Sequence, residues 1–146
     1  GRRKVAVADF FRGLFETDLK PGEMLTAIEV PEIQTNYRSG FSEFSRRSGD
    51  FAMSGLAAHA RFDGDVLSDV RLAYCGVGSR PLRARIAEQV LEGRPFGSAS
   101  LAEAKAALAK DLNPLDDLQA TGQMKLHLSQ VLVGRVLTAM RRADGG

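Results

Sequence analysis

The 146-residue chain lacks tryptophan and contains one cysteine, Cys75, and two histidines, His59 and His127. A single cysteine excludes an internal disulfide framework and is typical of a reducing compartment, so we expect a cytoplasmic location. One cysteine and two scattered histidines offer no ligand pair at the spacing of a zinc site. His59 is expected to lie on a segment facing that of Cys75, but the pattern favours a buried cysteine that packs as a small hydrophobic side chain.

Long hydrophobic runs and a strong excess of one charge are also missing. Residues 5–15 and 131–140 are interrupted by charged side chains, so neither provides the roughly 18 consecutive apolar residues of a membrane span. The basic start of the chain, residues 1–4, is not followed by a secretory hydrophobic segment. Twenty basic and 18 acidic residues leave a net charge of +2, too little for a nucleic-acid-binding surface. We therefore expect no membrane span and no nucleic-acid partner.

The residues that are present have the composition of a globular domain. Hydrophobic residues make up 44% of the chain and charged residues 26%. A chain of this length buries roughly two-thirds of its unfolded surface, which is enough for one core but not for two full domains. Residues 1–146 are therefore expected to form a single domain.

The first half of the chain predicts strands. The dipeptide Asp63-Gly64 is preferred in type I′ turns and separates two apolar segments, so residues 53–62 and 66–75 are expected to form an antiparallel hairpin. Met24–Val30 and Phe41–Arg47 alternate apolar and polar side chains, which predicts two further strands. Near the start, Asp9 is expected to cap a single helical turn.

The second half predicts three helices. The first is expected over Pro81–Leu91, the second from a cap at Ser98 or Ser100 to Leu112, and the third over Met124–Met140 after a cap at Thr121. Apolar spacing in the third predicts a sheet-facing stripe of Leu128, Val131, Leu132, Arg135, Val136 and Met140. The fold class is therefore α+β, with an antiparallel sheet of three to four strands packed against about three helices in a two-layer sandwich.

Two short motifs each allow a functional and a purely structural interpretation. Ser45–Asp50 places two arginines and a carboxylate around a glycine, which can form an anion-binding corner or simply a solvated turn. Gly76-Val77-Gly78 resembles a phosphate-binding turn and would support an independent nucleotide-binding protein. However, the third glycine of that motif would fall at Pro81, so a structural turn fits better. The sequence contains no nucleophile elbow, no P-loop and no paired carboxylates in a setting that would shift their pKa values.

Three segments in collinear order resemble the C-terminal domain of the FAD-binding medium subunit of molybdenum hydroxylases, the group of xanthine dehydrogenase and aerobic carbon monoxide dehydrogenase. They are Asp9-Phe10-Phe11-x-Gly13 continuing to Pro21-Gly22-Glu23-Met24-Leu25-Thr26 and Pro31, then Phe41-x-Glu43-x-x-Arg46-Arg47-x-Gly49-Asp50-Phe51-Ala52, and Arg71-Leu72-Ala73-Tyr74-Cys75-Gly76-Val77-Gly78-x-Arg80-Pro81. The resemblance runs from about Asp9 to about Ala143.

This resemblance implies a flavoprotein component of an oxidoreductase, with the isolated chain inactive. The chain would close one side of an FAD site that takes electrons from iron-sulfur clusters and passes them to NAD, a quinone or oxygen. An N-terminal domain of the same subunit would hold the FAD pyrophosphate. It is absent from this chain, which also starts without methionine. Molybdenum-pterin would lie in a large partner subunit and the 2Fe-2S clusters in a small one. The alternative is a non-catalytic module that docks these subunits.

The resemblance also implies where the flavin would be contacted. Leu25 matches a position against the flavin, Phe41 a position with an aromatic beside the ring, and the loop of Arg46 and Asp50 the acceptor side. The implied cofactor-binding residues are Leu25, Phe41, Ser42, Glu43, Arg46 and Asp50. Several relatives carry lysine at the position of Ser42 or Glu43, so a cation that would stabilise reduced flavin is not expected here.

Overall fold

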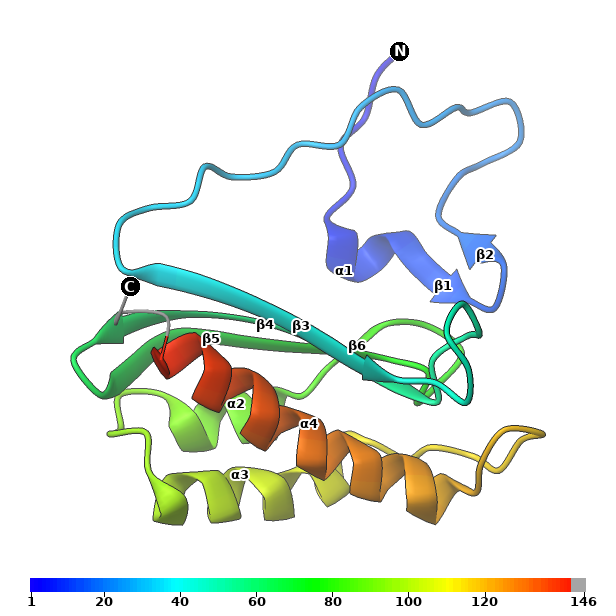
Figure 1. The fold of residues 1–146 in the computed structure, drawn as a ribbon. Helices are drawn as coiled ribbons and strands as arrows, with labels where there is room; N and C mark the ends of the chain where they lie inside the picture. Colours follow the sequence, from blue (N-terminus) through cyan, green and yellow to red (C-terminus); the bar gives the residue numbers. More distant parts are fainter. Residues whose placement is uncertain (143–146) are drawn as a thin grey trace.

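A four-stranded antiparallel sheet and three helices form a two-layer sandwich in the computed structural model, which describes residues 1–142 (Figure 1). The strands lie in the order β3-β4-β5-β6, and α2, α3 and α4 cover one face of the sheet. Their bounds are β3 Tyr37–Phe44, β4 Ser54–Asp63, β5 Val66–Cys75, β6 Leu82–Arg83, α2 Arg85–Leu91, α3 Ser98–Asp111 and α4 Gly122–Arg142. The predicted α+β sandwich is confirmed. Residues 143–146 of the expected domain lie outside the described residues.

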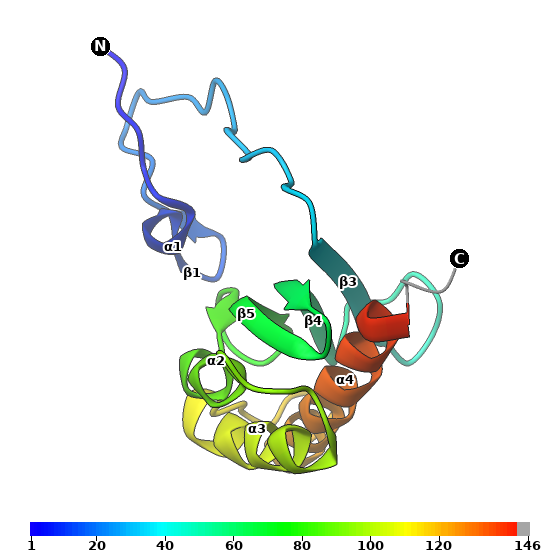
Figure 2. The same ribbon diagram turned by 90° about the vertical axis from the view of Figure 1, so that its left-hand side faces the viewer.

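Residues 1–36 form an arm on the other side of the sheet, away from the helices (Figure 2). It contains α1 (Val7–Phe10) and the two-stranded sheet of β1 (Phe11–Gly13) and β2 (Glu16–Thr17). Arg3 holds this arm together by binding the carboxylates of Asp18 and Glu23, which lowers the pKa of each to about 2. Arg80 links the arm to the sandwich by donating to the backbone carbonyl of Phe11 at 3.2 Å.

The core lies between the helix-facing side of the sheet and the three helices. Alternate residues of β4 and β5 are buried there, because successive side chains of a strand point to opposite faces. The fully buried large side chains include Leu56, Leu67, Leu72, Tyr74, Leu91, Leu108, Leu132 and Leu137. At Gly40 of β3 an added Cβ would lie 2.8 Å from Val136, so this glycine allows α4 to approach the sheet closely.

A buried chain of hydrogen bonds joins the sheet to α4. The Tyr74 hydroxyl donates to the carbonyl of Ser129 at 3.2 Å, and the Ser129 hydroxyl donates to the carbonyl of Lys125 at 2.8 Å. The hydroxyls of Ser54 and Ser129 lie 2.9 Å apart. Burial raises the pKa of Tyr74 well above its ordinary value, so the phenol stays protonated and keeps its role as a donor.

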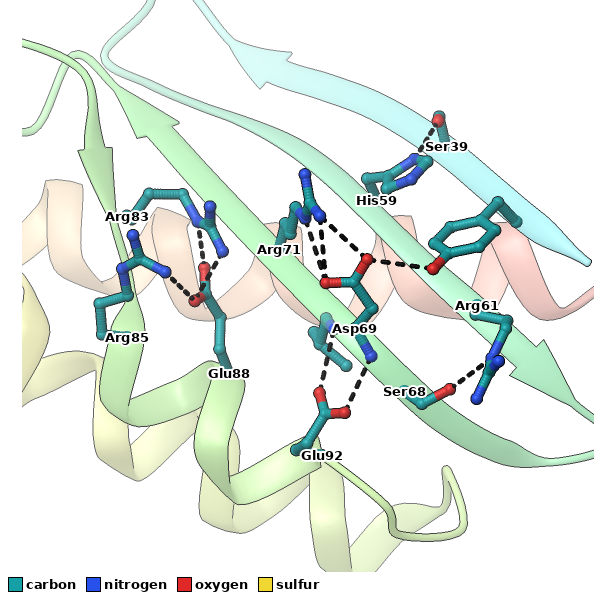
Figure 3. Close-up of polar contacts among 12 residues, drawn as sticks. Ser39, His59, Arg61, Ser68, Asp69, Arg71, Arg83, Arg85, Glu88 and Glu92 are labelled. Carbon is teal, nitrogen blue, oxygen red and sulfur yellow. Dashed lines mark hydrogen bonds and ion pairs between the residues drawn. The ribbon is translucent and has the colours of Figure 1, made fainter. Parts of the chain in front are cut away.

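Two carboxylates, one from α2 and one from its C-cap, complete the hydrogen bonding along one edge of β5 (Figure 3). Glu92 accepts from the backbone N–H groups of residues 69–70 at 2.9 and 3.0 Å. Glu88 accepts from the N–H of Leu72 at 2.8 Å and pairs with Arg83 through hydrogen bonds of 2.5 and 2.8 Å. They satisfy donors that the two-residue strand β6 leaves unpaired.

The strand predicted at Met24–Val30 is wrong. The segment belongs to the arm and pairs with no strand among residues 1–142, and its apolar side chains face solvent, with Val30 81% exposed. The predicted strand Phe41–Arg47 is shifted: β3 begins at Tyr37 because that stretch pairs with β4, and it ends at Phe44 before the arginines. Alternation alone predicts an extended chain, but a strand also needs a neighbour to accept its hydrogen bonds.

The predicted hairpin of β4 and β5 is confirmed, but its turn is displaced. Asp63 pairs with Val66, so the central residues are Gly64 and Asp65, and only Gly64 has positive φ, at 57°. Positive φ at the first central residue alone is typical of a type II′ turn, whereas the predicted type I′ turn requires positive φ at both central residues. In the arm, Asp9 lies inside α1 rather than at its cap, which is Ala6.

Helix ends and faces also differ in part from the predictions. Pro81 does not start a helix, because Leu82–Arg83 pair with β5 as β6 and α2 begins only at Arg85. The cap of α3 is Gly97 rather than Ser98 or Ser100. Thr121 does cap α4, accepting from the N–H of Met124 at 3.2 Å.

The sheet-facing stripe predicted on α4 is partly wrong. Val131 is half-buried and Arg135 is exposed, whereas Ser129, Val133 and Leu137 are buried in their place. The stripe is therefore rotated around the helix from its predicted position, because Ser129 faces the sheet, where it bonds to Ser54 and Tyr74.

Glu88→Gln is expected to lower the free energy of unfolding by about 2–3 kcal/mol, because it removes the charge that Arg83 pairs with in a largely buried position. Urea denaturation of the 146-residue chain measures this loss. Glu103→Gln is the matched control, since its pair with Arg94 is at the surface, with side chains 54% and 42% exposed. Equal losses in the two variants would contradict the role assigned to Glu88.

Candidate functional site

The uncovered face of the sheet presents a floor of small side chains. The register places Glu43, Gly55 and Cys75 in one row across β3, β4 and β5. The next row contains Phe41, Ala57 and Ala73. We call Gly55, Ala57, Ala73 and Cys75 the small-residue floor. Phe41 stands at its β3 edge with 64% of its surface exposed, so this part of the sheet can accept a flat apolar group.

The loop between β3 and β4, residues 45–53, borders this floor. The N–H of Asp50 donates to the carbonyl of Arg47 at 3.1 Å, and the Ser45 hydroxyl donates to the same carbonyl at 2.9 Å. Arg46 and Asp50 are exposed, and no ion pair joins Asp50 to either arginine within the described part of the chain. The loop is therefore a solvated turn whose charged groups remain available to a partner. Phe51 at its end is 87% exposed.

Gly76 allows the turn after β5 to pack closely against this loop. Its φ of 76° is in the left-handed region, and an added Cβ would lie 2.5 Å from the carbonyl oxygen of Ala52. Val77 beside it is buried, and β6 rather than a helix follows. The structural reading of Gly76-Val77-Gly78 is therefore confirmed, because a phosphate-binding turn would open a helix.

Cys75 is half-buried in the small-residue floor. Burial, and next the nearby Glu43 carboxylate, raise the pKa of its thiol above the ordinary value. Opposite it, a Cβ on Gly55 would lie 2.7 Å from the sulfur, so only glycine fits there. The thiol is thus a packed group of low nucleophilicity at neutral pH.

His59 lies in a different row from Cys75. It pairs across the sheet with Ser39, whose hydroxyl is 2.8 Å from its Nδ1, and stacks on Tyr37 with ring centroids 4.9 Å apart. Figure 3 shows it beside the Asp69–Arg71 pair. Within residues 1–142 no three His, Cys, Asp or Glu side chains come together as a metal site. The same residues include no helix long and apolar enough to cross a bilayer.

The structure brings some of the predicted site residues together and leaves others apart. Phe41 and Glu43 share the uncovered face with the small-residue floor, and the loop carrying Arg46 and Asp50 continues from the same strand. Ser42 is half-buried on the helix-facing side of β3. Leu25 lies on the arm and is 50% exposed.

The sequence analysis missed the small-residue floor. Its signal was present as small side chains at alternate positions of the two hairpin arms, at Gly55, Ala57, Ala73 and Cys75. Hydrophobic periodicity does not detect such a surface, because small residues contribute little to it. Their meaning depends on the register that brings the two arms side by side.

Cys75 is expected to react with iodoacetamide more slowly than glutathione at pH 8, because its raised thiol pKa leaves less thiolate. Glu43→Gln should increase the rate, since it removes a negative charge that disfavours the thiolate. As the only cysteine, Cys75 gives a single labelled product by mass spectrometry. Glu103→Gln should leave the rate unchanged. A Glu43 variant no faster than the parent would contradict this electrostatic contact.

Relatives identified by sequence share both this region and the arm. The chain is 31% identical over 132 residues to the glyceraldehyde dehydrogenase medium chain of Sulfolobus acidocaldarius, covering 90% of this chain and 47% of that protein. It is 29% identical over 139 residues to the carbon monoxide dehydrogenase medium chain of Hydrogenophaga pseudoflava, covering 95% and 48% respectively. The chain thus spans about half the length of the curated relatives that it matches.

Solved structures agree with these relatives. The Hydrogenophaga pseudoflava carbon monoxide dehydrogenase that lacks the Mo-pyranopterin moiety of its molybdenum cofactor superimposes with a TM-score of 0.91 at 31% identity, over 96% of this chain and 49% of that one. Quinoline 2-oxidoreductase from Pseudomonas putida 86 gives 0.85 at 28% identity, over 97% and 49%. The sequence model of the CO dehydrogenase flavoprotein C-terminal domain matches residues 39–140. The chain therefore belongs to the CO dehydrogenase flavoprotein C-terminal domain family.

Proposed function

We propose that the chain closes one side of the FAD site in a molybdenum-containing hydroxylase or dehydrogenase. The observation that carries this proposal is the small-residue floor beside Phe41, on the uncovered face of a sandwich whose relatives are oxidoreductase subunits. When bound, FAD supplies the electron-transfer chemistry between iron-sulfur clusters and a final acceptor, which is NAD, a quinone or oxygen.

The residues on this face fit part of the cofactor. A flat ring system needs a surface without protruding side chains, which Ala57 and Ala73 provide, whereas Gly55 is itself buried against Cys75, Glu43 and Ala52. Phe41 provides an exposed aromatic edge for such a ring. Arg46 and Asp50 offer a cation and a carboxylate at the rim, where they can influence access to the ring. Glu43 places a negative charge here, which disfavours an anionic reduced flavin.

The FAD pyrophosphate requires another part of the subunit. Gly76-Val77-Gly78 serves packing, and no phosphate-binding turn opens a helix in residues 1–142. We propose an N-terminal domain of the same subunit that holds the pyrophosphate. The arm supports this proposal because its apolar residues face solvent, with Met24, Ile28 and Val30 each at least 78% exposed. The arm and Leu25 would pack against that domain.

The remaining partners follow from the relatives. We propose that a large subunit carries the molybdenum-pterin centre and a small subunit the 2Fe-2S clusters. The single cysteine suits a reducing compartment, so we place the complex in the cytoplasm.

The chain alone is expected to be colourless and to tighten FAD retention by the N-terminal half of the same subunit. Equilibrium dialysis with FAD, followed by absorbance at flavin wavelengths, measures this effect. Phe41→Ala should weaken retention about tenfold, because it removes the aromatic contact with the ring. Leu118→Ala is the matched control, since Leu118 is 97% exposed on the loop between α3 and α4. Unchanged FAD affinity on adding the parent chain would exclude the cofactor role.

The alternative function is a docking module that holds the large and small subunits without touching FAD. The exposed side chains of the loop after β3 favour it as much as a cofactor role. Alanine substitutions at Arg46 and Asp50 separate the two functions. A cofactor role predicts altered flavin reduction kinetics in a complex that stays intact on size exclusion, whereas a docking role predicts loss of the complex.

A further inference from the structure

A positively charged groove is lined by residues of α3 and α4, two helices of the layer that covers the sheet (Figure 1). Its volume is about 520 Å³. Four of its residues, Leu101, Val131, Gly134 and Ala139, are apolar or small, and Thr138 lies between them. Three cations complete the lining: Lys105, Arg135 and Arg142. This groove is on the helix side of the sandwich, away from the small-residue floor.

Gly134 shapes the bottom of the groove. A Cβ at this position would lie 3.4 Å from Cε and 3.5 Å from Nζ of Lys105, and 3.5 Å from a methyl of Leu101. The side chains from α3 therefore lie directly over the backbone of α4. The groove is consequently shallow, and the Lys105 ammonium lies at its floor rather than extending into solvent.

No acidic side chain lines the groove, and its cations have no carboxylate partners in the part of the chain that is described. Arg135 stacks on the ring of Phe44 at 4.9 Å, while Lys105 and Arg142 form no ion pair there. Residues 122–142 of α4 contain no Asp or Glu at all. By contrast, Lys125 of the same helix is buried and pairs with Asp117 at 2.5 Å. The groove therefore lacks a counter-charge such as the one that Lys125 has in Asp117.

We propose that this groove binds an acidic amphipathic helix of a partner subunit, an inference that rests on the proposed membership of a multi-subunit complex. Carboxylates of that helix would meet Lys105, Arg135 and Arg142, and its apolar side chains would contact Leu101 and Val131. The stretch from Val131 to Arg142 is about 16 Å long, which matches about three turns of a helix.

Charge and shape both favour a protein helix over other anionic surfaces. A net charge of +2 gives little attraction for the phosphates of a nucleic acid. A bilayer surface would need protruding apolar side chains, but Leu101 and Val131 are half-buried at the floor of the groove.

A photo-crosslinking residue at Ala139 in the assembled complex identifies the occupant. We expect a crosslink to a partner-subunit peptide with acidic and apolar residues at helical spacing. A crosslinker at Ala106, which is exposed on α3 but does not line the groove, should not capture that peptide. A crosslink to a peptide without acidic residues, to a second copy of this chain, to lipid or to nucleic acid would overturn the proposal. So would the absence of any crosslink in an intact complex.

Charge reversal tests the proposed attraction between the groove cations and the carboxylates of the partner helix. K105E together with R142E should weaken binding of the crosslinked subunit about tenfold at low salt, with a smaller effect at high salt. K110E is the matched control, since Lys110 is an exposed α3 cation outside the groove.

FAD retention should stay unchanged in the double variant because the groove is remote from the small-residue floor. If FAD retention fails in the parent chain while the crosslink persists, the cofactor role is wrong and the docking groove stands. Equal binding by the double variant and the K110E control would overturn the proposal.

Discussion

Carboxylates that accept backbone N–H groups connect the layers of this sandwich. Glu88 of α2 and Glu92 at its C-cap bind donors along β5, and Asp111 at the end of α3 accepts from the N–H groups of residues 86–87 at the start of α2. Each contact satisfies a donor that a strand edge or a helix start leaves unpaired. Helix α2 is only seven residues long, so these contacts place it on the sheet, and α3 is positioned through it. The orientation of α2 and α3 depends on them, whereas α4 is joined to the sheet by the hydrogen bonds of Tyr74 and Ser54 to Ser129.

With one face of the sheet covered by helices, the other face is free to serve a partner. Small residues on the uncovered side of β4 and β5 contribute little to strand stability. They do leave room for a flat group, as the proposed FAD site requires. The relatives are about twice as long as this chain, and under the proposed function the remainder of such a subunit would lie on the other side of the flavin.

Much of the sandwich could be predicted from hydrophobic periodicity and from the residues typical of turns and helix caps. The hairpin was marked by Asp63-Gly64, and α4 was marked by Thr121 and its long helical pattern. The errors share one cause, which is that the decisive interactions come from distant parts of the chain. Pro81 opens no helix because Leu82 pairs with Tyr74, and Met24–Val30 forms no strand because no neighbour is present.

The candidate site was predictable only in outline. Phe41 and Glu43 were identified through the family resemblance, and the structure places both on the uncovered face. The floor beside them depends on cross-strand register, and the position of Leu25 depends on the arm. Neither can be derived from local sequence, since both are relations between segments that are far apart.

The polypeptide could be divided into two fragments at the point where the arm leaves the sheet. Asn36 adopts a left-handed conformation with φ of 70°, and its carbonyl accepts from the N–H of Phe62 at 2.9 Å. Beyond this anchor the arm is joined to the sandwich through Arg80. A break in the chain just before Asn36 would sever few stabilising contacts, so the subunit is well suited to fragment complementation. Gene fission or fusion at this position would likewise leave the sandwich core intact.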